Sequence, residues 1–240
     1  MKDLNLIELT NLEKRYGKKE ALNGVNLTIG RGKIIGLLGP NGSGKTTLIK
    51  LLNGLLQPTS GEIKVNGKAP GVDSKKIISY LPDKMYFADW MKISDLMNFF
   101  EDFDRKKAEA MCETLKINPE AKIKSLSKGN KEKVQLVLVM CRKAELYLLD
   151  EPIAGVDPAA RDFILDTILN NYNEEGTVII STHLIADIEK IMDEVIFIKE
   201  GSIVTYKSAD DLREESGKSI DALFREIFHT DVYRGGDEAC

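Results

Sequence analysis

The first thirty residues alternate between apolar and polar positions, most clearly at residues 6–9 and 25–29. Because successive side chains of a strand point to opposite faces of a sheet, this period of two predicts strands with one buried face. Glycine-containing turn signals lie at residues 17–19 and 30–32. A further strand is expected at 62–65, where an Asn-Gly turn follows. The N-terminal part is therefore predicted to form an antiparallel sheet.

Four short apolar runs show a different pattern, without this alternation. They occupy residues 34–38, 146–149, 177–180 and 195–198. Runs of this kind are typical of parallel strands whose two faces are both covered. Stretches with helical spacing separate them, so we predict an α/β protein with a three-layer core.

Between about residues 84 and 143 the spacing of the apolar residues becomes helical. One helix is expected to begin at Ser94, with its apolar face over residues 96–103. Asp104 is the expected N-cap of a second helix, and a third is predicted at about 129–142. These helices are predicted to form a subdomain inserted into the α/β core.

The patterns divide one domain of 240 residues into parts. Residues 1–83 and 144–207 are expected to supply the α/β core with its antiparallel β subdomain, and residues 84–143 the helical subdomain. Residues 208–240 are predicted to contain a helix capped by Ser219 and a polar, disordered tail.

Composition is typical of a soluble globular protein, with 30% charged and 42% hydrophobic residues and a net charge of −4. Nucleic-acid-binding domains are usually basic, so no nucleic-acid partner is predicted. No apolar run approaches the roughly 18 residues of a membrane span, and no signal peptide is recognisable. A cytoplasmic location is therefore expected. The three cysteines lie far apart, which favours neither a disulfide framework nor a zinc site.

Candidate chemistry begins directly after the first buried strand. Residues 39–46 read Gly-Pro-Asn-Gly-Ser-Gly-Lys-Thr, which fits the phosphate-loop (Walker A) pattern G-x-x-x-x-G-K-[ST], and a helical stretch follows. Glycines let backbone N–H groups turn inward around an anion, and the helix dipole adds to the attraction. Lys45 is expected at the β- and γ-phosphates of a nucleoside triphosphate, and Thr46 at Mg²⁺. The residues predicted to surround the phosphates are Gly39, Pro40, Asn41, Gly42, Ser43, Gly44, Lys45, Thr46 and Thr47.

Two adjacent acidic residues, Asp150 and Glu151, end the buried strand at 146–149. Asp150 is expected to hold Mg²⁺, directly or through water, and Glu151 to polarise the water that attacks the γ-phosphate. Their side chains are expected to point to opposite faces of an extended segment. His183 follows the strand at 177–180 and is expected to hydrogen-bond the γ-phosphate and the attacking water.

The segment Leu-Ser-Lys-Gly-Asn at 126–130 precedes the third predicted helix. In structural terms, Ser127 caps the helix and Gly129 relieves a tight bend. The same geometry presents the positive start of a helix to an anion, although no other phosphate motif lies beside it in sequence. Both roles are compatible, and the residues alone leave open which phosphate the segment meets.

The order of these motifs resembles the nucleotide-binding subunits of ABC transporters. It comprises the phosphate loop, residues 126–130, the acidic pair, Ala-Gly-Val-Asp at 154–157, and His183. The resemblance extends over about residues 4–207 and implies an ATPase of the P-loop NTPase class that uses ATP and Mg²⁺. Arg-Tyr-Gly at 15–17 resembles the aromatic loop of the family, which implies that Tyr16 stacks on adenine.

Two positions depart from the family pattern. Many members carry glutamine in place of Asp83, where it contacts Mg²⁺ and the attacking water and signals to the membrane subunit. Asp83 is shorter but still offers oxygen ligands, so it either contributes to the metal site or only caps the next segment. The signature reads LSKGN instead of LSGGQ and keeps Ser127 and Gly129. Asp157, expected at a subunit interface, precedes a proline and also has the pattern of an N-cap.

The resemblance also implies partners. Two subunits, identical or different, are expected to bind head to tail around two ATP molecules. Ser127 and Gly129 of one subunit would then complete the phosphate site of the other. The dimer would drive a separate integral membrane permease at the cytoplasmic face of the cell membrane. Residues 80–83 and the signature are most similar to the bacitracin-export-like ATPases, which favours export. The transported substrate does not follow from the sequence.

Three other classes share some of these motifs. Soluble ABC ATPases with an assembly role, of the iron–sulfur scaffold type, carry the same set. ABC proteins of translation or DNA maintenance usually have two cassettes or a long coiled-coil insertion, and neither is present in this sequence. A small-molecule kinase has the phosphate loop but gives no reason for residues 126–130 or His183.

Overall fold

The computed structural model describes residues 5–84, 87–100 and 102–229, so the predicted polar tail after 229 lies outside it. The strands are β1 (Asn5–Tyr16), β2 (Lys19–Gly30), β3 (Ile34–Leu38), β4 (Ser60–Val65), β5 (Ile78–Leu81), β6 (Leu146–Asp150), β7 (Thr177–Thr182), β8 (Glu194–Lys199) and β9 (Ser202–Ser208). The helices are α1 (Lys45–Leu52), α2 (Val72–Lys75), α3 (Ile93–Met97), α4 (Arg105–Thr114), α5 (Lys128–Met140), α6 (Pro158–Leu169), α7 (Ile185–Ile188), α8 (Ala209–Ser216) and α9 (Ile220–His229), with a 3₁₀ turn η1 (Ile123–Ser125).

The larger sheet has six strands in the order β5-β6-β7-β3-β8-β9. Its first five strands are parallel, and every residue of β3, β6 and β7 is buried. The short apolar runs are therefore confirmed as strands covered on both faces. The sequence pattern does not reveal β9, which pairs antiparallel with β8 at the edge of the sheet and has few apolar side chains, most of them half-exposed.

The smaller sheet is antiparallel, as predicted, and its strand order is β2-β1-β4. After β4 the chain turns through Asn66 and Gly67, whose φ angles of 52° and 73° are both positive. Reciprocal backbone hydrogen bonds between Val65 and Lys68 close this turn. A two-residue turn with two positive φ angles suits Asn-Gly, and here it closes on an isolated bridge between Val65 and Lys68.

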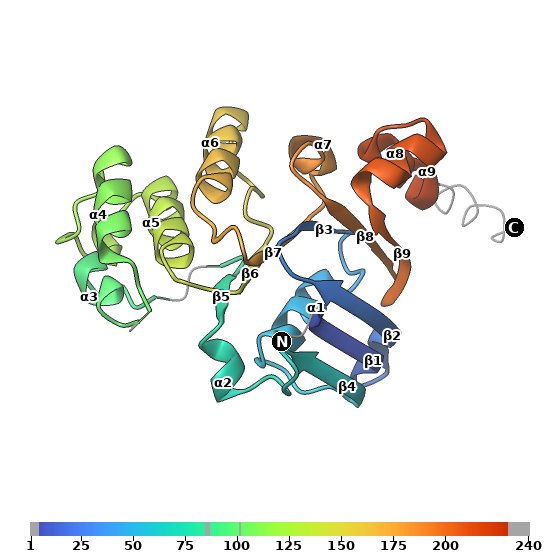
Figure 1. Cartoon of the computed structure of the whole chain (residues 1–240). Coiled ribbons are helices and arrows are strands. Elements are labelled where there is room, and N and C mark those ends of the chain that lie inside the picture. Colours follow the sequence, from blue (N-terminus) through green and yellow to red (C-terminus); the bar gives the residue numbers. More distant parts are fainter. Residues whose placement is uncertain (1–4, 85–86, 101, 230–240) are drawn as a thin grey trace, which may run out of the picture.

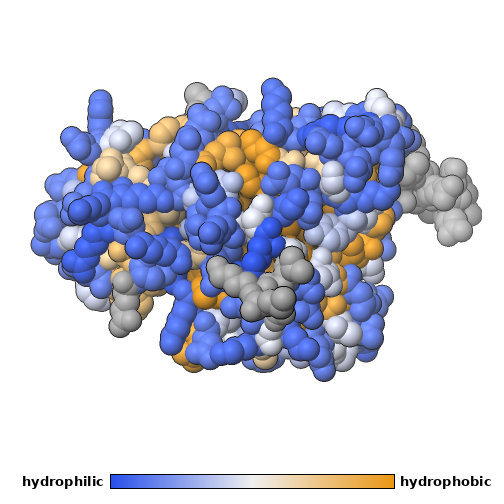
Figure 2. Space-filling view, in the orientation of Figure 1, coloured by the Kyte–Doolittle hydropathy of each residue, from blue (hydrophilic) through white to orange (hydrophobic). Residues whose placement is uncertain are grey.

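The larger sheet is covered on both faces (Figure 1). Helix α1 lies between the two sheets, within an apolar cluster formed by β1, β2, β4 and one face of the larger sheet. Helices α4–α9 line up over the opposite face, where a second apolar cluster joins them to the sheet. Figure 2, in the orientation of Figure 1, shows a mainly hydrophilic surface with scattered apolar patches. The predicted α/β core with its antiparallel sheet is confirmed.

Helices α3, α4 and α5 are inserted between β5 and β6, which are neighbours in the larger sheet. Asp104 caps α4 by accepting a hydrogen bond from the Lys107 N–H at 3.1 Å. Ser127 caps α5 by accepting one from the Asn130 N–H at 3.3 Å. These two helix starts agree with the predicted ones.

The prediction of a helix from Ser94 to about residue 103 is wrong about where the helix begins and ends. The N-cap of α3 is Lys92, two residues before the predicted cap Ser94, and the helix ends at Met97, so Phe99 lies outside it and is 75% exposed. Phe103 is buried, but in a backbone bridge with Arg142 and not on a helix. Tertiary pairing therefore overrides the helical spacing of these aromatic residues.

Helix α9 packs its aromatic face on the larger sheet. Phe224 and Phe228 contact the Phe197 ring of β8 edge-on, at 5.8 and 6.1 Å between ring centroids. The Ala222 N–H donates to the Ser219 hydroxyl at 3.2 Å, as predicted for the cap of this helix. No helix among residues 5–229, apart from the gaps named above, has the length and apolar character needed to cross a membrane.

Candidate nucleotide-binding site

The carboxyl ends of four neighbouring parallel strands carry the predicted chemistry. The chain leaves β3 into the phosphate loop and Lys45, and it leaves β5 at Asp83. Strands β6 and β7 end next to each other, with Asp150 in register with Ser181, so Glu151 and His183 follow at the same edge. Ligand sites of open α/β sheets lie at this edge because the helix starts also face it.

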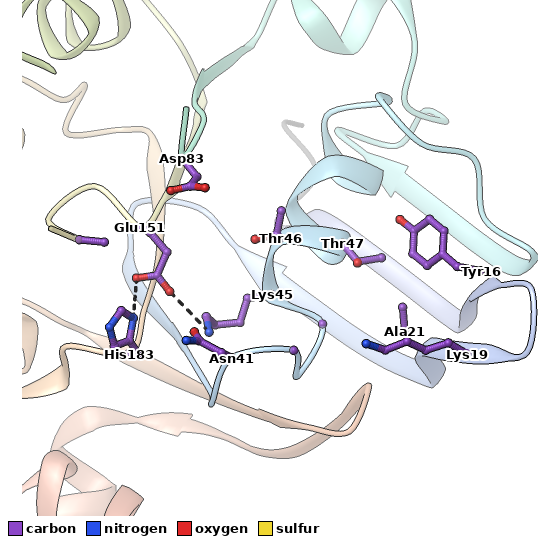
Figure 3. A pocket seen from close by; sticks show the side chains of 13 residues that line it. Tyr16, Lys19, Ala21, Asn41, Lys45, Thr46, Thr47, Asp83, Glu151 and His183 are labelled. Carbon is purple, nitrogen blue, oxygen red and sulfur yellow. Dashed lines mark hydrogen bonds and ion pairs between the residues drawn. The ribbon is translucent and has the colours of Figure 1, made fainter. Parts of the chain in front are cut away.

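A pocket of about 420 Å³ opens at this edge (Figure 3). Its wall joins the end of β1, the start of β2, the phosphate loop and the ends of β5, β6 and β7. The lining residues are Tyr16, Lys19, Ala21, Asn41, Gly42, Gly44, Lys45, Thr46, Thr47, Asp83, Glu151, Ala154 and His183.

At two positions of the phosphate loop the neighbouring backbone leaves no room for a side chain, so glycine is required. Gly44 has φ 114°, and a Cβ there would lie 2.6 Å from the Ala21 carbonyl oxygen. A Cβ on Gly39 would lie 2.4 Å from the Ile198 carbonyl oxygen. Side chains at these positions would push the loop away from β2 and β8, so the loop can curl inward only because glycine is present.

Lys45 is held at the back of the pocket, with 6% of its side chain exposed. Its ammonium donates to the carbonyl oxygens of Gly39 at 2.7 Å and Pro40 at 3.3 Å. It also lies 3.6 Å from a carboxylate oxygen of Glu151. Burial lowers the pKa of Lys45, while the Glu151 carboxylate opposes this shift.

Glu151 differs from the predicted extended conformation. Its φ of 52° is left-handed, so the chain turns sharply after β6. The Glu151 N–H donates to the Ser181 carbonyl oxygen at 3.0 Å, which anchors this turn on β7. The carboxylate reaches the His183 ring, 3.0 Å from Nδ1, and the Lys45 ammonium on its other side (Figure 3). Strained backbone of this kind often occurs at functional positions.

Asp150 is buried and faces the Thr46 hydroxyl. Its Oδ1 accepts hydrogen bonds from Thr46 at 3.1 Å and Ser181 at 2.6 Å, whereas its Oδ2 is buried without a hydrogen-bond partner. Burial raises the pKa of Asp150, and these two hydrogen bonds oppose the increase. An unpaired carboxylate oxygen beside a hydroxyl fits a hard cation such as Mg²⁺, which takes oxygen ligands.

Asp83 is exposed and lines the pocket on the side of Glu151 (Figure 3). Within the described residues, no three His, Cys, Asp or Glu side chains are arranged to hold a metal by themselves. Mg²⁺ usually binds through one or two protein ligands together with phosphates and water. Thr46 and Asp150, with Asp83 nearby, therefore fit a metal that arrives with a nucleotide.

Comparison with known proteins agrees with this geometry. The family model described as "ABC transporter" matches residues 22–154, more than half of the chain. The chain belongs to the ABC transporter family. An uncharacterised ABC transporter ATP-binding protein of Methanocaldococcus jannaschii is 34% identical over 86% of this chain and 79% of its own length. The chain is thus an ABC ATP-binding subunit, an ATPase that acts in transport.

Named relatives include proteins of export and resistance. The linearmycin resistance ATP-binding protein LnrL of Bacillus subtilis is 30% identical, over 88% of this chain and 72% of that protein. The lantibiotic transport ATP-binding protein SrtF of Streptococcus pyogenes is also 30% identical, over 85% and 92%. A solved ATP-binding subunit of an ABC transporter superposes with a TM-score of 0.82 at 25% identity, covering 92% of this chain and 98% of that one.

Some residues predicted for this ABC ATPase lie outside its pocket. Ser127 and Gly129 are exposed at the start of α5, and Asp157 begins α6. None of the three lines the pocket formed by their own chain. Gly39, Pro40 and Ser43 form the back of the phosphate loop, where the Ser43 hydroxyl is buried without a partner.

Sequence reasoning missed two lining residues, Lys19 and Ala21. Lys19 and Ala21 have a signal in the sequence, because they follow Tyr16 at the start of a strand and share one of its faces. Ala154 belongs to the motif at 154–157, but its place at the pocket depends on the sharp turn at Glu151, whose carbonyl oxygen accepts a hydrogen bond from the Ala154 N–H at 3.1 Å.

Proposed function

We propose that this chain hydrolyses ATP as one subunit of a head-to-tail dimer and drives a separate membrane permease in export. The observation that carries the proposal is the separation of two half-sites. Lys45, Glu151 and His183 meet in one pocket, while Ser127 and Gly129 present an exposed helix start elsewhere. A second subunit turned head to tail would bring the second half-site to the first.

The residues of the pocket suit distinct roles. Tyr16, 48% exposed at the end of β1, offers a ring on which adenine can stack. The N–H groups of the phosphate loop and Lys45 would bind the phosphates. Glu151 would accept the proton of the attacking water, and His183, bonded to it, would orient that water and the γ-phosphate. Bound by Thr46 and Asp150, with Asp83 contributing, Mg²⁺ would neutralise charge on the β- and γ-phosphates.

A cavity beside the helical insertion supports the proposal of a permease partner. A cavity of about 250 Å³ lies where the insertion meets the core, lined by Leu55, Tyr80, Phe87 and Phe100 together with Arg142. Leu55 is exposed and the three aromatic side chains are half-buried, so this apolar cavity suits an apolar segment of a membrane subunit. We propose that residues 84–143 move as one subdomain when this segment pushes on them. The location would then be the cytoplasmic face of the membrane.

The proposal of export rests on relatives. The names of two of them refer to linearmycin resistance and to lantibiotic transport. Resistance by an ATP-driven transporter normally removes a compound from the cell. These names support export, while the proposed placement in the bacitracin-export-like group rests on residues 80–83 and the LSKGN signature.

Glu151→Gln tests the hydrolytic part of this proposal. The amide keeps the size of the side chain but cannot accept the proton, so ATP should still bind while the turnover rate falls at least about a hundredfold. ATPase rate and ATP-dependent dimerisation by light scattering measure the two effects. Glu174→Gln, on an exposed loop, is the matched control. A fully active Glu151→Gln protein would remove this residue from the role of base.

Co-purification tests the transport partner. Tagged full-length chain, extracted with mild detergent from its own cells, should bring down an integral membrane protein. Recovery of a soluble scaffold protein in its place would instead support the assembly role shared by some soluble ABC ATPases.

A further inference from the structure

Helix α5 is attached to β5 by two polar links on one of its faces. The Ser79 hydroxyl donates to the Val139 carbonyl oxygen at 2.8 Å, near the base of the strand. The amide Nε2 of Gln135 donates to the Pro82 carbonyl oxygen at 3.1 Å, just beyond the end of the strand. Positions 135 and 139 lie one helical turn apart, so both links come from the same face of α5.

Gln135 stands out among its neighbours. It is 7% exposed, in a stretch of α5 where Val134, Leu136 and Val137 are all buried apolar residues. Burying an amide is unfavourable unless its hydrogen bonds are made. An aliphatic residue would fill this helix face without that requirement. The buried Gln135 amide therefore donates to the carbonyl oxygen of Pro82, the residue directly before Asp83.

A small cavity of about 60 Å³ lies between this link and the candidate site. Gln135 and Pro82 line it together with Asp83, Glu132 and Glu151. The cavity is large enough for water and has polar groups around it. The Gln135 amide is thus a direct neighbour of the space between Asp83 and Glu151, although it does not line the nucleotide pocket itself.

Helix α5 begins at Ser127, the segment proposed to meet the ATP of the second subunit. A helix is stiff, so a displacement of its start is carried to Gln135 two turns later. The hydrogen bond from Gln135 to Pro82 would then shift Pro82 and, with it, the backbone of Asp83. This chain of contacts joins two places that the sequence keeps more than 40 residues apart.

We propose that Gln135 is a positioning residue that sets the place of Asp83 according to the position of α5. The inference rests on the proposed function, in which Asp83 contributes to the metal and water site. Gln135 itself touches neither nucleotide nor metal. Without its amide donor, Asp83 would be held less firmly at the pocket, while the phosphate loop would stay as it is.

Gln135→Met tests this role, because methionine has a similar length but no donor. We expect the turnover number to fall about tenfold, as for other small displacements of a catalytic group. The affinity for ATP, measured by calorimetry, should stay within about twofold because Lys45 is not involved. Gln135→Ala serves the same purpose if the methionine variant does not fold.

Ser79→Ala is the matched control, since it removes the other link between α5 and β5. We expect it to lower the melting temperature by a few degrees and to leave the turnover number unchanged. Loss of turnover in both Ser79→Ala and Gln135→Met would indicate a general loosening of α5 and would overturn the specific role of Gln135.

A double-mutant cycle with Asp83→Ala separates the inference from the function on which it rests. If Gln135 acts through Asp83, the double variant should be no slower than Asp83→Ala alone, because the partner is already absent. If Asp83→Ala is slower than the original chain but the two effects multiply, the inference is wrong and the role of Asp83 stands. If Asp83→Ala turns over normally, the proposed role of Asp83 fails, and the inference fails with it.

Discussion

At the scale of single residues, the Lys45 ammonium is shared among three oxygen-bearing groups. Two are carbonyls of its own loop, and the third is the carboxylate of Glu151. These contacts keep a buried cation in place, although burial lowers its pKa. Nucleotide phosphates offer more negative charge than the carbonyls do, so the same ammonium can turn to them without moving far.

Lys45→Ala should therefore weaken ATP binding by about ten- to a hundredfold, the range expected for losing hydrogen bonds to a charged group. Calorimetric titration with ATP in the presence of Mg²⁺ measures the change. Lys18→Ala, which removes an exposed cation from the nearby β1–β2 turn, should leave the affinity as it was. Unchanged affinity of Lys45→Ala would contradict the assignment of the phosphate loop.

The sequence predicts single residues well where the covalent chain itself sets the geometry. The phosphate loop is one example, because eight consecutive residues and the following helix define it. Glu151 is a counterexample, since its left-handed backbone depends on hydrogen bonds to β7, 30 residues away. The link from Gln135 to Pro82 spans 53 residues and leaves no local pattern at either end.

At the scale of elements, two helices start with the same device. Asp104 caps α4 and Asp157 caps α6, each accepting a hydrogen bond at 3.1 Å from an N–H three residues later. One cap lies in the helical insertion. The other follows the turn at Glu151 and belongs to the surface that we propose for the second subunit.

Replacing either aspartate with alanine should lower the free energy of unfolding by about 1 kcal/mol, which chemical denaturation measures. Only Asp157→Ala should also reduce ATP-dependent dimerisation in light scattering. Equal dimerisation of the two variants would mean that Asp157 is a helix cap and nothing more. Asp157→Asn keeps a capping side chain and separates the two effects.

The sequence predicts elements correctly where the same spacing of apolar residues continues through the whole element, as in the buried strands and α4. The helix expected from Ser94 shows the limit, because aromatic residues at helical spacing also suit a connection that packs on neighbouring elements. Phe103 is buried beside Arg142, and the Asp104 N–H donates to the Cys141 carbonyl oxygen at 2.7 Å. Such long-range pairing has no signature in a short window.

At the scale of the whole molecule, Arg142 ties the helical insertion to the core. Its guanidinium donates to the Asp102 carboxylate at 2.9 and 3.1 Å and to the Ile78 carbonyl oxygen at 2.5 Å. The same group lies over the Phe100 ring, 4.7 Å from its centroid. With only 10% of its side chain exposed, Arg142 joins the connection before α4 to the start of β5.

Arg142→Ala should lower the free energy of unfolding by about 2–3 kcal/mol, since several charge-assisted hydrogen bonds are lost together. Arg142→Lys should recover only part of this, because lysine lacks the planar fork of donors. Thermal unfolding measures both. Arg225→Ala is the control, because it removes an ion pair with Asp221 in which the arginine is 65% exposed, so the pair contributes little. Similar losses for Arg142→Ala and Arg225→Ala would contradict the connecting role.

The position of β3 in the middle of the larger sheet has a consequence for how the protein is made. Its partners, β7 and β8, begin roughly 140 and 160 residues later in the chain. At the pace of a ribosome, about 5–20 residues per second, the first of them emerges roughly 7–30 s after β3. During that interval the apolar strand is without its native neighbours, and the phosphate loop that follows it lacks the walls that β6 and β7 supply. The newborn chain is therefore expected to depend on chaperones until β7 and β8 have been synthesised.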